Sequence, residues 1–448
     1  MFRSVRQFCR IVPERTEVTE REAEAMRIRL KNGNVYHNHR LEQMDVLVAD
    51  GKIERLYAEK ESAVQGPAAG NSGREAQMQT QMCTPQNTAG NREAMAETNE
   101  ANEAEEVIDL SGKYLVPGFL DIHTHGAVGV DVNGADADGF ERISRFFASQ
   151  GTANWLCSIL TDTREQTLHA IGEYRRWKER TEHRGAELLG IHLEGPFLCS
   201  AYKGAMPEQL LRKPDLGLLR EYQEAAGGDI RYITVSPEVE GVAEAIPAMK
   251  ALGMQVAIGH SGADYETARR AIANGAAAAT HVGNAMRLLH QHEPSIFGAV
   301  LEDDEVYCEA ICDGRHLHPG TVRFFMKMKG RGRLIAVTDS IMAAGLPDGN
   351  YKLGVNDVVV LDGDAKLLDG TRAGSTLTTG QALRNLLRFT GKNLTELLPL
   401  LTENPAKLIG VYDRIGSIEP GKDADLVVLG ADLQVEQTFV KGEKRYAG

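Results

Sequence analysis

The sequence predicts an α/β protein, a (β/α)₈ TIM-like barrel with a small β-sandwich domain built from its N- and C-terminal segments. Eight short apolar runs alternate with helix-like stretches between Leu120 and about Ala344, which indicates the barrel. Segments such as "MRIRLKNGNVY" and "DADLVVLGADLQ" at either end indicate the small domain. A doubly wound sheet is the alternative, but the glycine-rich turn after its first strand is absent. The eight runs are, in chain order, FLDIH, ANWLCSIL, ELLGIHLE, IRYITVSP, QVAIGHS, AAAATHV, VYCEAICDG and RLIAVTDS.

The barrel and the small β domain interleave along the chain. We expect the barrel at residues 119–349, with its C-terminal helices at 371–410. Asp50-Gly51 reads as a hairpin turn between two of the outer strands. We expect the small β domain to be assembled from four segments, namely 26–58, 107–118, 350–370 and 411–448.

Two further segments lack the pattern of a folded unit. Residues 59–106 are rich in Ala, Gln, Asn, Glu and Gly, and they carry too few large apolar side chains to offset the entropy of ordering. We expect a flexible insertion there, with a partner-binding role as the weaker alternative. Residues 1–25 contain arginines but no apolar h-region, so we expect a disordered extension and not a secretory signal.

Composition excludes several classes of protein. A length of 448 residues with 42% hydrophobic residues allows a large core. The net charge of −13 argues against a nucleic-acid or anionic-membrane partner, and no apolar run reaches the length of a membrane span. The six cysteines have no framework spacing, so we interpret them as reduced thiols and expect a cytoplasmic protein.

Residues that could bind a metal stand where the predicted strands end. In "DIHTHG", His123 and His125 are two positions apart, so they point to the same side of a strand. The carboxyl ends of barrel strands form one rim, and barrel enzymes carry their chemistry there. The sequence therefore predicts a metal site to which other runs contribute Glu194, His260, His281 and Asp339.

These ligands are nitrogen and oxygen atoms without thiolate. Such a set favours a catalytic Zn²⁺, Fe²⁺, Mn²⁺ or Co²⁺ over a structural zinc closed by cysteines. A metal lowers the pKa of water from about 15.7 toward about 7, and a carboxylate on a separate strand, such as Asp339, can accept the proton. The competing role for Asp339 is that of an additional metal ligand. The pattern predicts a hydrolase that acts on an amide or an ester.

A set of longer motifs resembles the N-acetylglucosamine-6-phosphate deacetylase family of the amidohydrolase superfamily, over roughly residues 26–56 and 107–446. The H-x-H pair and "GKDADLVV" are common to the superfamily, whereas "HLEGP", "GHS", "THxxNAM" and "DGxHxxP" in this order are specific to the deacetylases. The resemblance implies metal-dependent hydrolysis of N-acetylglucosamine 6-phosphate to glucosamine 6-phosphate and acetate, in amino sugar catabolism. The motifs are LVPGFLDIHTHG, GIHLEGPFL, AIGHSGADYETARRAIANGAAAATHVGNAM, CDGRHLHP, AVTDSIMAAGLPDG and GSIEPGKDADLVVL.

The resemblance also implies residue roles and a homodimer in which a neighbouring subunit reaches the phosphate pocket. Glu194, His260 and His281 would hold the principal metal, most simply Zn²⁺. His123 and His125 could hold a second ion, so the count is one or two per subunit, and Asp339 would be the catalytic acid and base. Substrate contacts carry over to Ala205, Asn284, Ala285, His292, His316, Ala373, Gly374 and Ser375.

Two positions depart from the family pattern. Met206 follows "KGA" where the family has histidine, and His292 stands at the spacing of a phosphate-binding arginine. Imidazole cannot offer the bidentate fork of a guanidinium, although His290, Arg287 and Arg315 could make a weaker anion site. Deacetylation of N-acetylgalactosamine 6-phosphate or of an unphosphorylated amino sugar is therefore the alternative.

Two rival functions are weaker. Cyclic-amide hydrolases of the superfamily usually bridge two metals with a carbamylated lysine on strand four, and "IRYITVSPE" contains no lysine. A non-catalytic scaffold should show gaps in its ligand set, and this sequence shows none.

Overall fold

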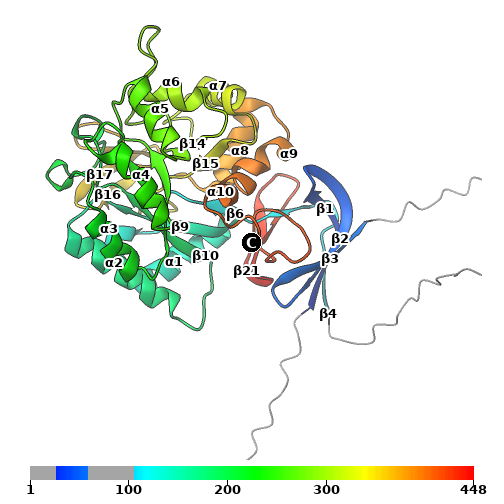
Figure 1. The fold of residues 1–448 in the computed structure, drawn as a ribbon. Helices are drawn as coiled ribbons and strands as arrows, with labels where there is room; N and C mark the ends of the chain where they lie inside the picture. The colour runs from blue at the N-terminus through cyan, green and yellow to red at the C-terminus, as the bar shows by residue number, and fades with distance from the viewer. Residues whose placement is uncertain (1–26, 59–104) are drawn as a thin grey trace, which may run out of the picture.

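A computed structural model describes residues 27–58 and 105–448 as a barrel with a smaller β domain beside it (Figure 1). The expected disordered extension at 1–25 lies outside the described residues. The expected flexible insertion at 59–106 does so too, except for its last two positions, which begin a strand.

Eight parallel strands form the barrel sheet, and each pairs with the next along the chain. The first and last strands approach each other just beyond their ends, where Thr124 bridges Ser340 and the Asp339 amide donates to the His123 carbonyl at 2.8 Å. The sheet is thus nearly closed, as the sequence predicts. The strands are β6 (Phe119–Asp121), β9 (Thr152–Leu160), β10 (Glu187–Glu194), β11 (Ile230–Val235), β12 (Gln255–Ile258), β13 (Ala278–Ala279), β14 (Tyr307–Ile311) and β15 (Leu334–Val337).

The helices surround this sheet and separate its strands along the chain (Figure 1). Several begin after an Asp or Thr whose side chain accepts a backbone N–H of the first turn, as Asp136, Thr163 and Asp264 do. The α-helices are α1 (Ala137–Ser149), α2 (Arg164–Lys178), α3 (Leu216–Ala225), α4 (Val242–Ala251), α5 (Tyr265–Ala273), α6 (Ser295–Glu302), α7 (Pro319–Lys329), α8 (Thr379–Thr390), α9 (Leu394–Leu397) and α10 (Glu403–Leu408). Short 3-10 turns occupy Val132–Gly134, Ser200–Tyr202, Glu208–Leu210 and Leu398–Leu400.

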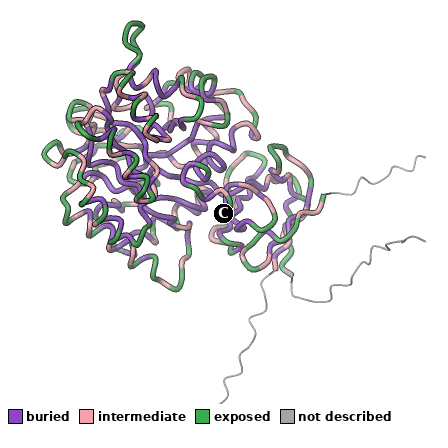
Figure 2. The backbone as a smooth tube through the Cα atoms, viewed as in Figure 1, coloured by how far each residue is buried: buried purple, intermediate pink, exposed green. Residues whose placement is uncertain are grey.

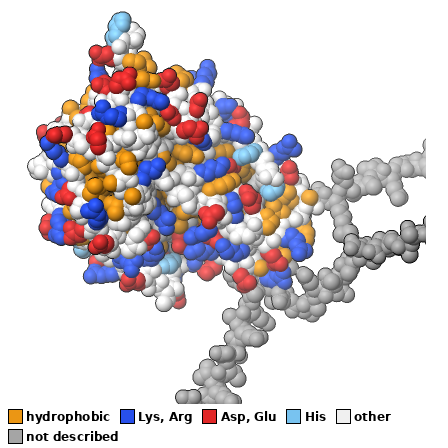
Figure 3. Space-filling view, in the orientation of Figure 1, with side chains coloured by type: hydrophobic (Ala, Val, Ile, Leu, Met, Phe, Trp, Pro, Cys, Tyr) orange, Lys and Arg blue, Asp and Glu red, His pale blue; other side chains and the backbone are white. Residues whose placement is uncertain are grey.

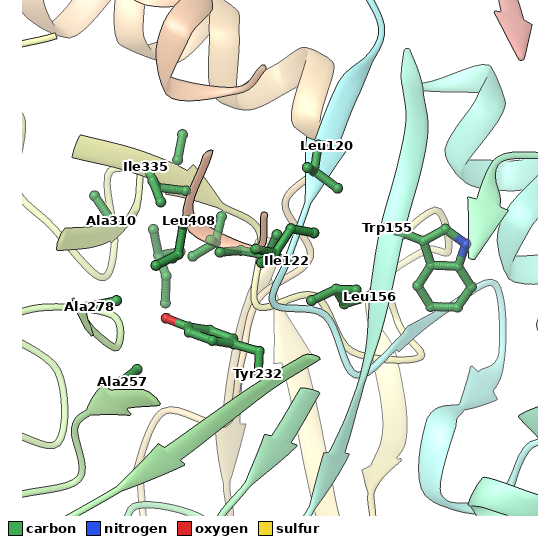
Figure 4. Close-up of a cluster of buried hydrophobic side chains, with 14 of the residues drawn as sticks. Leu120, Ile122, Trp155, Leu156, Tyr232, Ala257, Ala278, Ala310, Ile335 and Leu408 are labelled. Carbon is green, nitrogen blue, oxygen red and sulfur yellow. The ribbon is translucent and has the colours of Figure 1, made fainter. Parts of the chain in front are cut away.

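The barrel strands are buried over nearly their whole length (Figure 2). Every residue of β9 is buried, which is typical of a parallel sheet covered on both faces. Apolar side chains from several strands, among them Leu120, Leu156, Ala257 and Ile335, belong to one core in the interior (Figure 4). None of the helices in the described part of the chain is both long and apolar enough to cross a membrane.

The small domain is one eight-stranded sheet made from both ends of the chain. Its apolar core includes Val46 of the N-terminal part and Phe439 of the C-terminal part, and the turn at Gly51 packs against Gly442. The sheet therefore folds over its own core, as the predicted sandwich requires. Its strands are β1 (Arg27–His37), β2 (Arg40–Ala49), β3 (Lys52–Ala58), β4 (Glu105–Asp109), β5 (Tyr114–Pro117), β19 (Leu426–Leu429), β20 (Val435–Val440) and β21 (Glu443–Ala447).

Residues 350–370 do not join this domain, and that part of the prediction is wrong. They form a separate three-stranded sheet of β16 (Gly349–Leu353), β17 (Asn356–Leu361) and β18 (Asp364–Leu367). Its inner face, including Leu353 and Val358, packs on Leu198, Met206 and Ile341 near the carboxyl ends of the barrel strands. A two-stranded ribbon of β7 (Gly126–Ala127) and β8 (Val130–Asp131) follows the first barrel strand.

Candidate metal centre and active site

The six predicted metal and catalytic side chains converge where the barrel strands end. All six residues are buried, although they come from five different strands or the turns after them. They form two groups of three in which ligand atoms lie within 4.8 Å of one another, namely Glu194, His260, His281 and His123, His125, Asp339.

In the first group, the His260 Nε2 and Glu194 Oε1 atoms lie 3.0 Å apart. The His281 Nε2 atom lies 3.3 Å from the same carboxylate oxygen and 3.1 Å from the His260 Nε2 atom. The three atoms thus surround one point at nearly equal spacing.

In the second group, the His123 and His125 Nε2 atoms lie 3.3 Å apart. The Asp339 Oδ1 atom lies 3.2 Å from His125 Nε2 and 3.7 Å from His123 Nε2. The other carboxylate oxygen of Glu194 is 3.2 Å from His125 Nε2, so Glu194 faces both groups.

These spacings fit divalent cations. Ligands about 2.0–2.1 Å from a tetrahedral ion lie about 3.3–3.4 Å from one another, close to the edges of both groups. The His125 Nδ1 atom is 3.0 Å from the Ser158 carbonyl, and the His260 Nδ1 atom is 3.0 Å from the Tyr202 carbonyl. A carbonyl can only accept, so each Nδ1 donates and leaves an Nε2 lone pair directed at its group. Each group could therefore hold one metal ion.

Three of these residues have an unusual backbone conformation. The φ angles of His260, His281 and Asp339 are +48°, +27° and +50°, in the region that non-glycine residues rarely adopt. Such residues cost free energy and persist where the surrounding structure holds them, as at functional sites. The conformation turns each side chain inward directly after its strand.

The electrostatics of the two groups are dominated by carboxylate–imidazole contacts. Burial would raise the pKa of Glu194, but the His123 charge and hydrogen bonds from the histidines lower it well below its usual value. Burial likewise opposes ionisation of Asp339, and the contacts with His125 and His123 lower its pKa. Both carboxyl groups are therefore anionic at neutral pH, as a metal ligand or a proton acceptor must be.

A cavity of about 600 Å³ opens above the two groups. Of the predicted substrate-contacting residues, six line it, namely Ala205, Asn284, Ala285, His316, Ala373 and Gly374. Ser375 lies behind the wall, where its amide donates to the Asp339 carbonyl at 2.7 Å. Met206 also lines the cavity, and its side chain is buried against the three-stranded sheet.

The structure does not bring His292 to this cavity. It belongs to an exposed loop, 287–293, that projects beside α6 (Figure 1), and histidine side chains are seen at the tip of that projection (Figure 3). The cationic lysine and arginine side chains that line the described cavity are Lys203 and Arg372. Arg372 makes a forked contact with Asp364, at 3.1 and 3.3 Å.

Sequence reasoning missed Glu309 and residues 369–372, although it did predict the next two residues, Ala373 and Gly374. Glu309 is fully buried on β14 and lies 3.0 Å from the His123 Nδ1 atom. The available signal was a lone charged residue inside the apolar run "VYCEAICDG". Residues 369–374 line the cavity from the turn that follows the three-stranded sheet, and no sequence pattern placed that sheet over the barrel.

Comparison with known proteins agrees with this geometry. A model of the Amidohydrolase family matches residues 114–445. The chain belongs to the amidohydrolase family. This amidohydrolase is 38% identical over 330 residues to an N-acetylglucosamine-6-phosphate deacetylase of Bacillus subtilis, an alignment that covers 73% of this chain and 83% of the relative. It is 33% identical to an N-acetylgalactosamine-6-phosphate deacetylase of Escherichia coli O157:H7, over 75% of this chain and 89% of the relative.

Solved structures extend the likeness to the whole fold of this amidohydrolase. The N-acetylglucosamine-6-phosphate deacetylase of Pasteurella multocida aligns with a TM-score of 0.80 at 28% identity, covering 94% of this chain and 100% of that one. The enzyme of the same name from Thermotoga maritima aligns with a TM-score of 0.76 at 30% identity, again covering 94% and 100%.

Proposed function

We propose that this protein is a metal-dependent deacetylase that hydrolyses N-acetylglucosamine 6-phosphate to glucosamine 6-phosphate and acetate. The observation that carries the proposal is the pair of candidate metal-ligand groups at the floor of a cavity, one of which includes the Asp339 carboxylate. The likeness to deacetylases over most of the chain supports the substrate class.

Glu194, His260 and His281 would hold the principal ion, with Zn²⁺ the first choice for this nitrogen and oxygen donor set. His123 and His125, with Asp339 beside them, would hold a second. A bound divalent cation polarises the acetamide carbonyl and lowers the pKa of water at the site.

Asp339 would move the proton. Its carboxylate takes a proton from the water that attacks the acetamide carbon, and it then protonates the departing nitrogen as the C–N bond breaks. The products are acetate and the free amine, so atoms and charge balance. The Asp339 backbone is held by hydrogen bonds to the His123 carbonyl and from the Ser375 amide, at 2.8 and 2.7 Å, which keeps the carboxylate over the site.

The sugar would lie against the cavity-lining residues Ala205, Asn284, Ala285, His316 and Gly374. A phosphate carries nearly two negative charges, so the phosphate end of the cavity needs cationic side chains. We assign that end to Lys203 and Arg372, because His292 lies outside the cavity of its own chain.

A substrate panel tests this assignment. Acetate release should be fastest with N-acetylglucosamine 6-phosphate, and Arg372→Met should raise KM for it about tenfold or more, the value of one charge-assisted contact. KM for unphosphorylated N-acetylglucosamine should not change. Arg145→Met, which removes an exposed arginine of α1, is the matched control. Equal turnover of the phosphorylated and unphosphorylated sugars would overturn the phosphate assignment.

A second candidate substrate is N-acetylgalactosamine 6-phosphate, which the name of the Escherichia coli relative supports. The same panel separates the two epimers by kcat/KM. The homodimer and the cytoplasmic location remain predictions.

A further inference from the structure

Glu309 is a buried carboxylate in the interior of a barrel strand, where the fold alone would be satisfied by an apolar side chain. It is fully buried on β14, among Ala and Ile positions of the strand interior. The Tyr232 hydroxyl donates to its Oε1 atom at 2.7 Å, and Figure 4 shows the Tyr232 ring among apolar side chains from neighbouring strands. A buried carboxylate is costly unless it is hydrogen-bonded, so its partners indicate what it is for.

The other two hydrogen bonds of the Glu309 side chain both come from predicted metal ligands. Its Oε2 atom accepts from the Nδ1 atom of His123 at 3.0 Å and from the backbone N–H of His281 at 3.2 Å. His123 belongs to one ligand group and His281 to the other. One carboxylate oxygen thus contacts a ligand residue of each group.

His281 needs such support more than its neighbours do. The Nδ1 atoms of His125 and His260 each face a carbonyl oxygen, whereas the buried Nδ1 atom of His281 has no hydrogen-bond partner among residues 27–58 and 105–448. Its φ of +27° is also strained for a non-glycine residue. The hydrogen bond from its backbone N–H to Glu309 therefore helps to fix the ring.

We propose that Glu309 is a positioning residue for metal binding, held in place by Tyr232. The carboxylate keeps the His123 proton on Nδ1, so that the Nε2 lone pair faces His125 and Asp339. It also holds the backbone of His281 in the conformation that directs this ring to Glu194 and His260. The proposal rests on the two metal-ligand groups and does not depend on which amino sugar is hydrolysed.

Metal affinity tests the proposal without any substrate. Full-length wild type, Glu309→Gln and Tyr232→Phe are stripped of metal, and Zn²⁺ affinity and stoichiometry are measured by competition with a chromogenic chelator. Disrupting a hydrogen-bond partner of a metal ligand typically weakens binding by about 10–100-fold, and we expect a loss in that range in Glu309→Gln, because a neutral amide oxygen is a weaker acceptor than a carboxylate. We expect a smaller loss in Tyr232→Phe, because the carboxylate and both of its contacts to ligands remain.

A second readout separates positioning from a structural role. The visible absorption of the Co²⁺-loaded protein should change in Glu309→Gln, because the ligand field changes. Tyr174→Phe is the matched control, since it removes another buried tyrosine–carboxylate hydrogen bond, the 3.0 Å contact with Asp229. It should leave both readouts unchanged.

Wild-type Zn²⁺ affinity and an unaltered Co²⁺ spectrum in Glu309→Gln would overturn the proposal, whatever happens to thermal stability. If Glu309→Gln does not fold, wild-type metal affinity in a folded Tyr232→Phe would overturn the role of the Tyr232–Glu309 pair. If Glu309→Gln binds metal more weakly than wild type, and metal-loaded wild type hydrolyses none of the sugars, this inference is supported and the proposed substrate is refuted.

Discussion

Replacing Asp425 with asparagine should stabilise the protein more at neutral pH than at pH 5. The Asp425 carboxylate is buried where the small β domain meets the barrel, and it accepts hydrogen bonds from the Asn154 amide at 2.8 Å and the Lys441 backbone at 2.7 Å. Burial raises the pKa of Asp425 from 3.8 to about 6, although these hydrogen bonds oppose the shift. Between pH 3.8 and pH 6 the Asp425 carboxyl group is therefore mostly protonated in the folded state and mostly ionised in the unfolded chain. The associated stability is fully present below pH 3.8 and is lost as the pH rises through 6.

The magnitude follows from the two pKa values. A difference of about two pKa units corresponds to roughly 3 kcal/mol, of which about 1.4 kcal/mol is lost between pH 5 and pH 7.5. With an unfolding entropy of about 2.1 cal/mol/K per residue, that loss equals roughly 2 °C in Tm for the described part of the chain. An asparagine does not ionise. It can keep both contacts if Asn154 turns its amide, because the Asn154 Oδ1 atom has no hydrogen-bond partner in the described part of the chain.

Scanning calorimetry of both full-length proteins at pH 5, 6 and 7.5 measures the effect. The Tm of Asp425→Asn minus that of wild type should grow by roughly 2 °C from pH 5 to pH 7.5. Asp357→Asn, which changes an exposed carboxylate of β17, is the matched control. A Tm difference for Asp425→Asn that stays constant or narrows as the pH rises would refute the reasoning.

Three further predictions concern the candidate site. Asp339→Asn should lower kcat for acetate release by about 10²–10⁴-fold, the usual value of a positioned acid and base, and a kcat within about twofold of wild type would exclude Asp339 from proton transfer. Gly374→Ala should lower kcat about tenfold or more and reduce stability by about 1–2 kcal/mol in calorimetry. The reason is that Gly374 has a φ of +63°, and an added Cβ would lie 2.5 Å from the Ile341 Cγ2 atom and 2.8 Å from the Asp339 carbonyl oxygen. His292→Ala should leave KM for the phosphorylated sugar within about twofold of wild type, and a rise of about tenfold would contradict the assignment of the phosphate to Lys203 and Arg372.

The barrel and the convergence of the candidate metal ligands could be predicted because both depend on local patterns. Apolar runs of strand length, each followed by a helix-like stretch, are enough to place His123, Glu194 and His281 on one rim. The H-x-H spacing predicts two imidazoles on the same side of the chain. His123 and His125 lie just after β6, and their Nε2 atoms are 3.3 Å apart.

The features that could not be predicted from the sequence depend on contacts between segments that are far apart in the chain. β16 to β18 show the same alternation as the small-domain strands, and only packing against Leu198 and Met206 assigns them to the barrel mouth. The spacing of the family motif predicted a phosphate contact at His292. Spacing along the chain does not show whether a loop folds over a cavity or projects away from it. Glu309 was missed because one charged residue in an apolar strand does not indicate a function until its hydrogen-bond partners are known.

Metal content and acetate release measured on the same sample test the central claim most directly. Wild-type protein stripped with a chelator and titrated with Zn²⁺ should regain hydrolysis of N-acetylglucosamine 6-phosphate in proportion to the metal it binds. Glu194→Gln should bind less metal and regain little activity, because its carboxylate faces both ligand groups. Full acetate release from metal-free wild type, or from a metal-free Glu194→Gln variant, would contradict the account.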